Sequence, residues 1–359
     1  MSSAWNNRIS VSVFGEAQSP AIGVTVNNLP SGEYIDVQEI RKFMSRLNSN
    51  NHKENIMPHV MSGIFNEHTT GTPLCAFIQN YSPAPVVNTP ETDRLARPGH
   101  ADYTGTVRYK GFNDVRENGH FSERLTVPLC FAGAVCGQIL ERRGIYTGTH
   151  IASLHKIKDN LFNPVKITRD DIISVHNKDF PVINDRKGWL MTEEIERIRK
   201  KGDSLGGVVE CAVINVPAGI GSPIFDGIQN TISQLVFGIP FVTGIEFGAG
   251  FRSAGMTGSD WNDEFYVDNH GHVLTETNSH GGVLGGISSG MPIIFKVAFR
   301  PNPSVARKQN AVDLHDMTNE SFSCDTDYEP CTVMRAVPAV EAIANIAILT
   351  HMMDYPNFC

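Results

Sequence analysis

The sequence lacks several features that would place the protein in common functional classes. Its seven cysteines stand singly, without a C-x-x-C pair, so neither a metal site nor a disulfide framework is expected. Basic residues number 30 against 38 acidic ones, and the net charge of −8 argues against a nucleic-acid partner, which requires a basic face. No unbroken stretch of about 18 apolar residues occurs, and residues 1–10 contain no apolar signal core. We therefore expect a soluble cytoplasmic protein with no metal and no membrane contact.

Length and composition are those of one folded domain. The chain has 359 residues, of which 41% are hydrophobic and 19% charged, so it can bury a sizeable core. It contains no internal repeat and no linker-like segment. Residues 82–96 are rich in Pro, Asn and Thr, and they are predicted to form a surface loop rather than a boundary. A single domain over residues 1–359 is expected.

Periodicity predicts alternating strands and helices. An amphipathic helix is predicted at residues 36–47 with Asp36 as its N-cap, and another helix at residues 192–201. Residues 128–143 and 338–353 predict two buried helices. Strands are predicted at residues 9–14, 21–26, 74–79, 208–216 and 293–299. Since no strand is followed by a G-x-G-x-x-G turn, a layered α/β domain is favoured over a doubly wound sheet.

Two segments could bind an anion. Residues 280–290 contain five glycines, which allow backbone N–H groups to approach a ligand or simply form a tight structural loop. The turn Arg300-Pro301-Asn302-Pro303-Ser304 combines a cation, an amide and a hydroxyl, a set that suits a phosphate group. A solvated turn is the commoner use of such a segment, so spacing leaves both alternatives open.

A third segment concentrates ionisable side chains. Arg97, His100, Asp102 and Tyr103 lie within seven residues around a Pro-Gly turn. They could supply a general acid and an anion clamp. A single cluster of this kind is more often structural than catalytic.

Several long motifs give the chain a family resemblance. It contains RPGHADYT from Arg97 to Thr104, TNSHGGVLGGISSG from Thr277 to Gly290 and RAVPAVEA from Arg335 to Ala342. With these motifs the chain resembles the chorismate synthase family, and most of all the branch found in clostridia and their relatives. The resemblance implies the α/β chorismate-synthase fold, with packed β-sheets in the core and helices outside, and a homotetramer.

The resemblance also implies an activity and a set of site residues. The family is a class of lyases that need reduced FMN. They remove phosphate from 5-enolpyruvylshikimate 3-phosphate by 1,4-anti elimination and give chorismate without net redox change. The implied catalytic positions are His100, Glu329 and Gln18. The implied substrate-binding residues are Arg46, Arg97, Arg116, Arg124 and Arg335. The implied cofactor-binding residues are His120, Phe121, Ser122, Phe241, Gly285, Arg300, Asn302 and Ser304.

Some positions depart from the family pattern. Gln18 replaces a histidine, and Asp327 replaces an arginine. Within the family's R-G-G-G segment the chain has Glu117 and Asn118, and Glu123 replaces a small residue. Because the added charges are negative, they should weaken binding of a multiply charged anion. We therefore expect weak turnover of the family substrate, or the same chemistry on a less anionic ring.

Two other classes of function remain open from the sequence. The loss of a catalytic histidine at Gln18 would suit a flavin-binding protein without elimination activity, whereas the retained His100 and Glu329 argue against it. An FMN-dependent oxidoreductase would consume NAD(P)H continuously, which a lyase would not.

Overall fold

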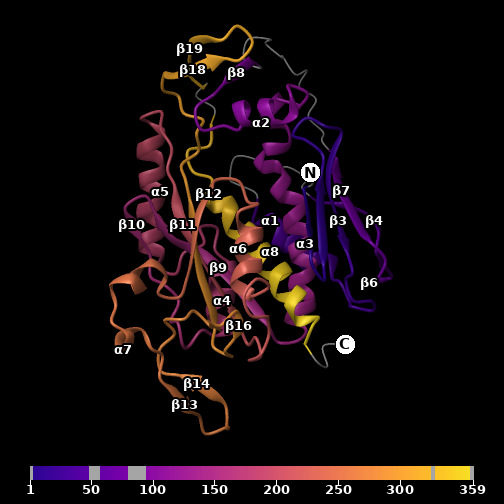
Figure 1. Ribbon diagram of the computed structural model, residues 1–359, viewed down its shortest axis with the longest axis vertical. Helices are drawn as coiled ribbons and strands as arrows, with labels where there is room; N and C mark the ends of the chain where they lie inside the picture. Colours follow the sequence, from indigo (N-terminus) through magenta and orange to yellow (C-terminus); the bar gives the residue numbers. More distant parts are fainter. Residues whose placement is uncertain (1–2, 48–56, 80–93, 325–327, 356–359) are drawn as a thin grey trace.

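The fold is built from two sheets with two long helices between them. The computed structural model describes residues 3–47, 57–79, 94–324 and 328–355. Within these residues, helix α3 (Thr126–Glu141) packs against the first sheet and helix α8 (Val333–Met352) against the second. The two helices also pack on each other, so the layers follow the order sheet, helix, helix, sheet (Figure 1).

Both sheets have five antiparallel strands, and they contain all the predicted strands. The first sheet has the order β1 (Ala4–Asn6), β2 (Ser10–Phe14), β3 (Ala21–Asn27), β7 (Leu74–Gln79), β4 (His59–Ser62). The second has the order β10 (Ile157–Lys158), β9 (Tyr146–Leu154), β11 (Gly207–Ile214), β17 (Ile293–Phe299), β12 (Val242–Phe247). The predicted strands at residues 74–79 and 293–299 are confirmed to the residue.

The second sheet is buried on both faces. In β11, Cys211 and Val213 join the large core, whereas Ala212 points into a smaller core with Phe162 and Val175. The outer face is covered by α4 (Arg169–His176), which packs on β9. Burial on both faces explains why apolar residues occupy both faces of this strand, apart from the buried Glu210, which accepts hydrogen bonds from His150 and Phe162 N.

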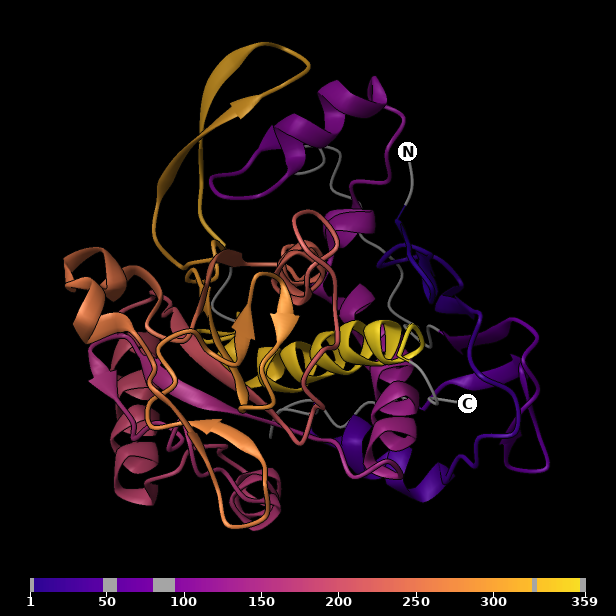
Figure 2. The ribbon, with the colours of Figure 1, turned by 60° about the horizontal axis from the view of Figure 1, so that its bottom comes forward.

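The helices α3 and α8 are the centre of the molecule. The expectation of helices outside the sheets holds for α4, but α3 and α8 lie inside the fold (Figure 2). Nearly every side chain of α8 is buried. By length and composition α8 could cross a membrane, yet 89% of its most apolar stretch is buried within the fold. It is a core helix because its apolar surface is covered by α3 and by β9 and β11.

Glycines permit the close approach of α3 and α8. A Cβ at Gly133 would overlap Ala342, and one at Gly137 would press on the Asn345 side chain. Since Gly133 faces Ala342 while Gly137 faces Asn345, the helices run in the same direction. Their N-terminal ends therefore lie at the same end of the molecule.

Helix boundaries differ from the predictions where a glycine or proline lies within a helix. The helix predicted at residues 36–47 is confirmed as α1 (Val37–Ser45), and the side chain of its N-cap Asp36 accepts a hydrogen bond from Gln38 N. Helix α5 (Asp185–Arg199) begins seven residues earlier than residue 192, with Gly188 packed closely against Val182. Helix α8 begins five residues before Pro338. In each case burial of the helix outweighs a locally unfavourable residue.

Shorter elements surround both ends of the buried helices. Beside their N-terminal ends lie α2 (Asp102–Tyr109), η2 (Arg116–Phe121), η3 (Glu123–Leu125) and a sheet of β8 (Leu95–Ala96), β18 (Gln309–Asp313) and β19 (Thr318–Phe322) (Figure 1). The remaining elements are β5 (Ile64–Phe65), β6 (His68–Thr69), α6 (Ile228–Val236), η4 (Gly250–Gly255), α7 (Gly258–Trp261), β13 (Phe265–Val267), β14 (Val273–Thr275), β15 (Val283–Leu284) and β16 (Ile287–Ser288). Most of the predicted loop at residues 82–96 lies outside the described residues.

Candidate active site

The candidate site lies where α3 and α8 begin. The unpaired N–H groups of a helix N-terminus carry a partial positive charge. Here two such ends lie together, and five chain segments meet beside them: residues 15–19, 97–102, 114–125, 300–304 and 328–335. This arrangement suits an anionic ligand.

His100 lies in the turn that leads into α2. Asp102 holds this turn because its carboxylate accepts hydrogen bonds from the backbone N and the guanidinium of Arg97. The half-buried His100 ring has Nδ1 3.0 Å from Asn118 Oδ1 and Nε2 3.4 Å from Ser304 Oγ. Burial lowers the pKa of His100 below its ordinary value, and the charge of Arg97 lowers it further. The ring is therefore neutral near pH 7.

The turn at residues 300–304 follows β17 and contacts the His100 turn. The Arg300 guanidinium lies 5.1 Å from the centre of the Phe241 ring and donates to the Gly99 carbonyl at 2.8 Å. Asn302 Nδ2 donates to the Glu329 carbonyl at 3.0 Å, and Asn302 Oδ1 accepts from Ser304 N. These bonds give the turn a fixed shape, which is required of a phosphate-binding segment.

Glu329 and Glu123 share one arginine. Arg335, on the first turn of α8, has Nη2 3.1 Å from Glu329 Oε2 and Nη1 3.1 Å from Glu123 Oε1. Burial raises the pKa of Glu123 above its ordinary value, although the charge of Arg335 opposes this. Two carboxylates thus face one guanidinium, so Arg335 has less positive charge to offer a ligand.

Gln18 lies half-buried beside the segment at residues 114–125. Its neighbour Ala17 donates its N–H to the Gly119 carbonyl at 3.0 Å and accepts from Arg124 Nη1 at 3.4 Å. Position 18 is therefore held at the site by backbone contacts on its N-terminal side.

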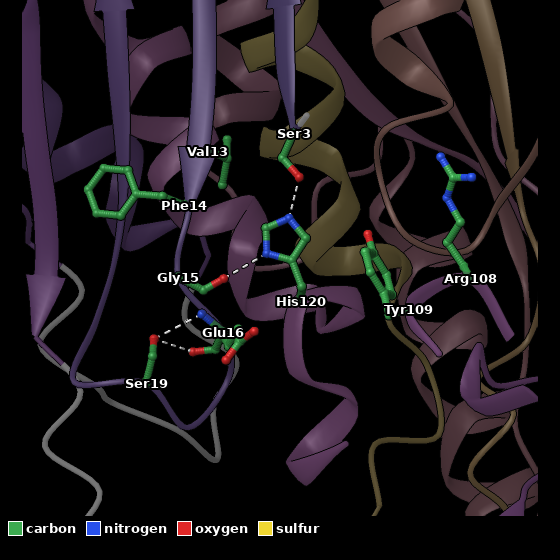
Figure 3. A pocket seen from close by; sticks show the side chains of 9 residues that line it. All are labelled: Ser3, Val13, Phe14, Gly15, Glu16, Ser19, Arg108, Tyr109 and His120. Carbon is green, nitrogen blue, oxygen red and sulfur yellow. Dashed lines mark hydrogen bonds between the residues drawn. The ribbon is translucent and has the colours of Figure 1, made fainter. Parts of the chain in front are cut away.

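A cavity of about 670 Å³ opens beside residues 15–19 and His120. His120 contributes its ring, with Nδ1 2.7 Å from the Gly15 carbonyl and Nε2 against the Ser3 hydroxyl (Figure 3). The other lining residues are Val13, Phe14, Glu16, Ser19, Arg108 and Tyr109. Phe121, close to Tyr109, is 42% exposed, whereas Ser122 is buried and caps η3 with its side chain. Aromatic rings beside a cation suit a planar anionic ligand.

Two further candidate arginines are paired with carboxylates of their own segment. Arg116 binds Asp114 through Nε at 2.8 Å and Nη2 at 2.6 Å, and this pairing lowers the pKa of Asp114. Arg124 Nη1 lies 3.9 Å from Glu117 Oε2. Both arginines belong to the segment at residues 114–125, and their charges are partly compensated by these carboxylates.

Arg46 does not join the other arginines. Its guanidinium binds Glu341 of α8 at 2.7 and 3.1 Å, and the same carboxylate accepts from Thr149 and lies 3.1 Å from His176 Nε2. Glu341 follows Arg335 by six residues, roughly 9 Å along the helix. The structure therefore gives Arg46 a place in a buried ion pair, which corrects its expected role in substrate binding.

Gly285 also lies apart from the other candidate residues within one chain. It forms the tip of the β15–β16 hairpin, where Gly285 and Gly286 have φ of 61° and 85°. The hairpin contacts the start of α6 through Ile228, whereas Phe241 and Arg300 lie beyond the ends of α6 and β17. The length of β17 separates them by roughly 20 Å. Close packing requires glycine at position 286, because a Cβ there would overlap the Ser222 carbonyl.

Sequence reasoning missed the role of one side chain. Asn118 binds both His100 and Arg97, but it attracted notice only as a departure from the R-G-G-G segment. The signal was there, because a family glycine often marks a backbone with positive φ, and Asn118 has a φ of 68°. Asp327 lies outside the described residues.

Comparison with known proteins agrees with this geometry. The family model described as Chorismate synthase matches residues 9–353. The chain belongs to the chorismate synthase family. It is 39% identical over 351 residues to a chorismate synthase of Thermococcus gammatolerans, with 96% of each chain covered. A chorismate synthase of Dehalococcoides mccartyi is 38% identical over 364 residues, covering 97% of this chain and 96% of the relative.

A solved structure confirms the fold. A crystal structure of chorismate synthase superposes with a TM-score of 0.75 at 23% identity and covers 97% of this chain and 93% of the other. The α/β chorismate-synthase fold is therefore confirmed, and membership of the family makes the protein a lyase of aromatic amino acid biosynthesis.

Proposed function

We propose that the protein is an FMN-dependent lyase that removes phosphate from 5-enolpyruvylshikimate 3-phosphate to give chorismate. The observation that carries this proposal is the meeting of His100, Glu329 and the Arg300 turn at the N-terminal ends of α3 and α8. A proton-exchanging ring, a carboxylate and a fixed cation are the groups that such an elimination requires.

The residues at the site fit an FMN cofactor. Arg300, Asn302 and Ser304 would hold the phosphate, because they form a fixed turn with one cation. Phe241 lies against the Arg300 guanidinium, and His120, Phe121 and Ser122 come from the segment beside the cavity. Reduced FMN, when bound, supplies transient electron donation that assists departure of the substrate phosphate.

The protein's own side chains would handle protons and charge. His100 is neutral near pH 7 and can hold or pass a proton at its ring. Glu329 offers a second proton-exchanging group, oriented by Arg335. Gln18 can orient a phosphate by hydrogen bonding but has no proton to donate near neutral pH. The substitution at Gln18 thus affects acid catalysis.

Binding of FMN tests this proposal through Arg300. Arg300→Ala is expected to weaken FMN binding by about 1.5–3 kcal/mol, or roughly 10- to 150-fold, because a charged partner of the cofactor phosphate is lost. Quenching of flavin fluorescence on titration measures the affinity. Lys308→Ala is the matched control, since Lys308 is exposed and carries the same charge. Equal affinities for the two variants, or no saturable binding by the parent, would contradict the proposal.

The Glu123–Arg335 pair favours a second candidate, a less anionic ring as the substrate of the same chemistry. In this family a small residue is found at position 123, and here a carboxylate lies 3.1 Å from Arg335. An anionic ligand that approaches Arg335 would also approach Glu123 and Glu329. Like charges brought together in a desolvated site cost several kcal/mol.

Removal of the Glu123 charge tests which of the two candidate substrates, the family substrate or a less anionic ring, the site prefers. Glu123→Gln is expected to lower the KM for 5-enolpyruvylshikimate 3-phosphate by about 10- to 100-fold, because Arg335 regains charge for the ligand. Glu193→Gln, on the exposed side of α5, changes the net charge equally and should leave KM unchanged. An unchanged KM in Glu123→Gln would mean that Arg335 does not meet the substrate.

The rival functions have less support. Neither a flavin-binding protein without elimination activity nor an FMN-dependent oxidoreductase is favoured, because the relatives that cover 96% of the chain are chorismate synthases. We further propose a soluble cytoplasmic homotetramer that binds a small anionic ring and no nucleic acid. Large exposed side chains such as Phe225 and Phe251, 83% and 84% exposed, support burial against other subunits, which sedimentation would report.

A further inference from the structure

We propose that Asn118 is a positioning residue for His100: its side-chain oxygen accepts the Nδ1 proton and leaves Nε2 as the nitrogen that exchanges protons with a ligand. The proposal rests on the proposed function only in giving His100 a catalytic role. The contact itself, 3.0 Å between His100 Nδ1 and Asn118 Oδ1, does not depend on the reaction.

Arg97 settles which end of the Asn118 amide faces the ring. Arg97 Nη2 lies 2.7 Å from the same Asn118 atom, and a guanidinium can only donate. That atom must therefore be the oxygen, since the amide nitrogen would set one donor against the guanidinium donor. The oxygen then accepts from His100 as well, so the proton of the neutral ring resides on Nδ1.

The backbone of Asn118 aims its side chain at the ring. Glu117 and Asn118 have φ of 47° and 68°, in the left-handed region that glycine adopts most easily. Asn tolerates this region better than most residues, whereas Glu does not. The next residue, Gly119, has no room for a Cβ because it would overlap the Asp114 carbonyl oxygen. At a position where the family carries glycine, this chain therefore has an amide that reaches His100.

Burial and the charges around His100 keep its ring neutral, and the contact with Asn118 determines which nitrogen of the neutral ring carries the proton. Burial lowers the pKa of His100 first, and Arg97 and Arg300 lower it further, whereas Asp102 and the Asn118 hydrogen bond raise it. In a neutral ring one nitrogen donates and the other accepts. With Nδ1 bound to Asn118, the accepting Nε2 faces Ser304 Oγ at 3.4 Å, on the turn proposed to hold phosphate.

Residue-resolved chemical labelling tests the proposal without requiring activity. Diethylpyrocarbonate modifies only unprotonated imidazole, so the pH dependence of labelling, read by mass spectrometry of the His100 peptide, gives the titration midpoint. Asn118→Asp is expected to raise the midpoint by about one unit or more, since it places a carboxylate against Nδ1. Asn118→Gly should speed labelling of His100 several-fold, because the ring loses its fixed partner.

Two internal references make the result specific. Glu117→Gly relaxes the same left-handed turn without removing the amide, so it should leave the His100 midpoint unchanged. The exposed His272, on the hairpin of β13 and β14, should label identically in every variant.

The outcomes distinguish the inference from the proposed function. If Asn118→Asp and Asn118→Gly both leave the midpoint and labelling rate of His100 at the parent values, Asn118 does not position the ring. If labelling shifts as expected and the pH profile of kcat moves upward with it in Asn118→Asp, both proposals are supported. A labelling shift in a protein that never releases phosphate would retain the role of Asn118 and reject the proposed reaction.

Discussion

Replacement of Gln18 by histidine is expected to raise the rate of phosphate release by about 10²- to 10⁴-fold, the usual contribution of a positioned general acid. Glutamine can bind a phosphate oxygen but cannot protonate it. The backbone at Ala17 is tied to Gly119 and Arg124, so the new ring would be held beside the site. An anaerobic assay with chemically reduced FMN and saturating 5-enolpyruvylshikimate 3-phosphate measures the effect as phosphate release.

Gln18→Asn is the control for the Gln18→His variant, because it changes the side chain without adding a proton donor. Parent turnover at about 1 s⁻¹ or above, an ordinary enzyme rate, with no gain in Gln18→His would contradict the prediction. Another donor would then serve, and His120, beside the cavity and hydrogen-bonded to Gly15, is the first to examine. Loss of that turnover in His120→Gln would identify it.

Removal of the Glu341 charge is expected to lower the free energy of unfolding by about 3–5 kcal/mol at pH 7, because it leaves a buried guanidinium without its counter-ion. The side chains of Glu341 and Arg46 are only 5% and 16% exposed. Urea denaturation of Glu341→Gln measures the loss. Glu39→Gln is the control, since Glu39 is 55% exposed, lies 3.9 Å from Arg142 and should contribute less than about 1 kcal/mol. A small effect in both variants would mean that Arg46 finds another partner.

The same carboxylate gives stability a defined pH dependence. Burial alone would raise the pKa of Glu341, but the charges of Arg46 and His176 outweigh it and hold the pKa well below the ordinary 4.5. The stabilisation is therefore complete above about pH 4.5 and is lost as the pH falls toward the folded-state pKa. The difference in urea midpoint between the parent and Glu341→Gln should shrink in acid. A difference that stays constant between pH 7 and pH 3 would argue against this ion pair.

Much of the secondary structure was predictable because its causes are local. The strands at residues 74–79 and 293–299 alternate or run apolar between clear ends, and Asp36 provides a capping side chain two residues before its donor. Predictions failed at helix starts: Pro338 suggested that the last helix begins there, whereas α8 begins at Val333. Packing against α3 extends the helix past this signal, and packing is not visible in a local pattern.

The motifs and their chemistry were present in the sequence, but their grouping was not. The family resemblance of the motifs implied His100, Glu329 and Arg300 as site residues, and the structure brings their segments together at one end of α3 and α8. Only the tertiary structure separated Arg46 and Gly285 from them. It also showed that Glu117 lies near Arg124 and that Glu123 pairs with Arg335. Contacts between residues about 200 positions apart, such as Glu123 and Arg335, arise from the layering of the sheets and helices, which no local pattern encodes.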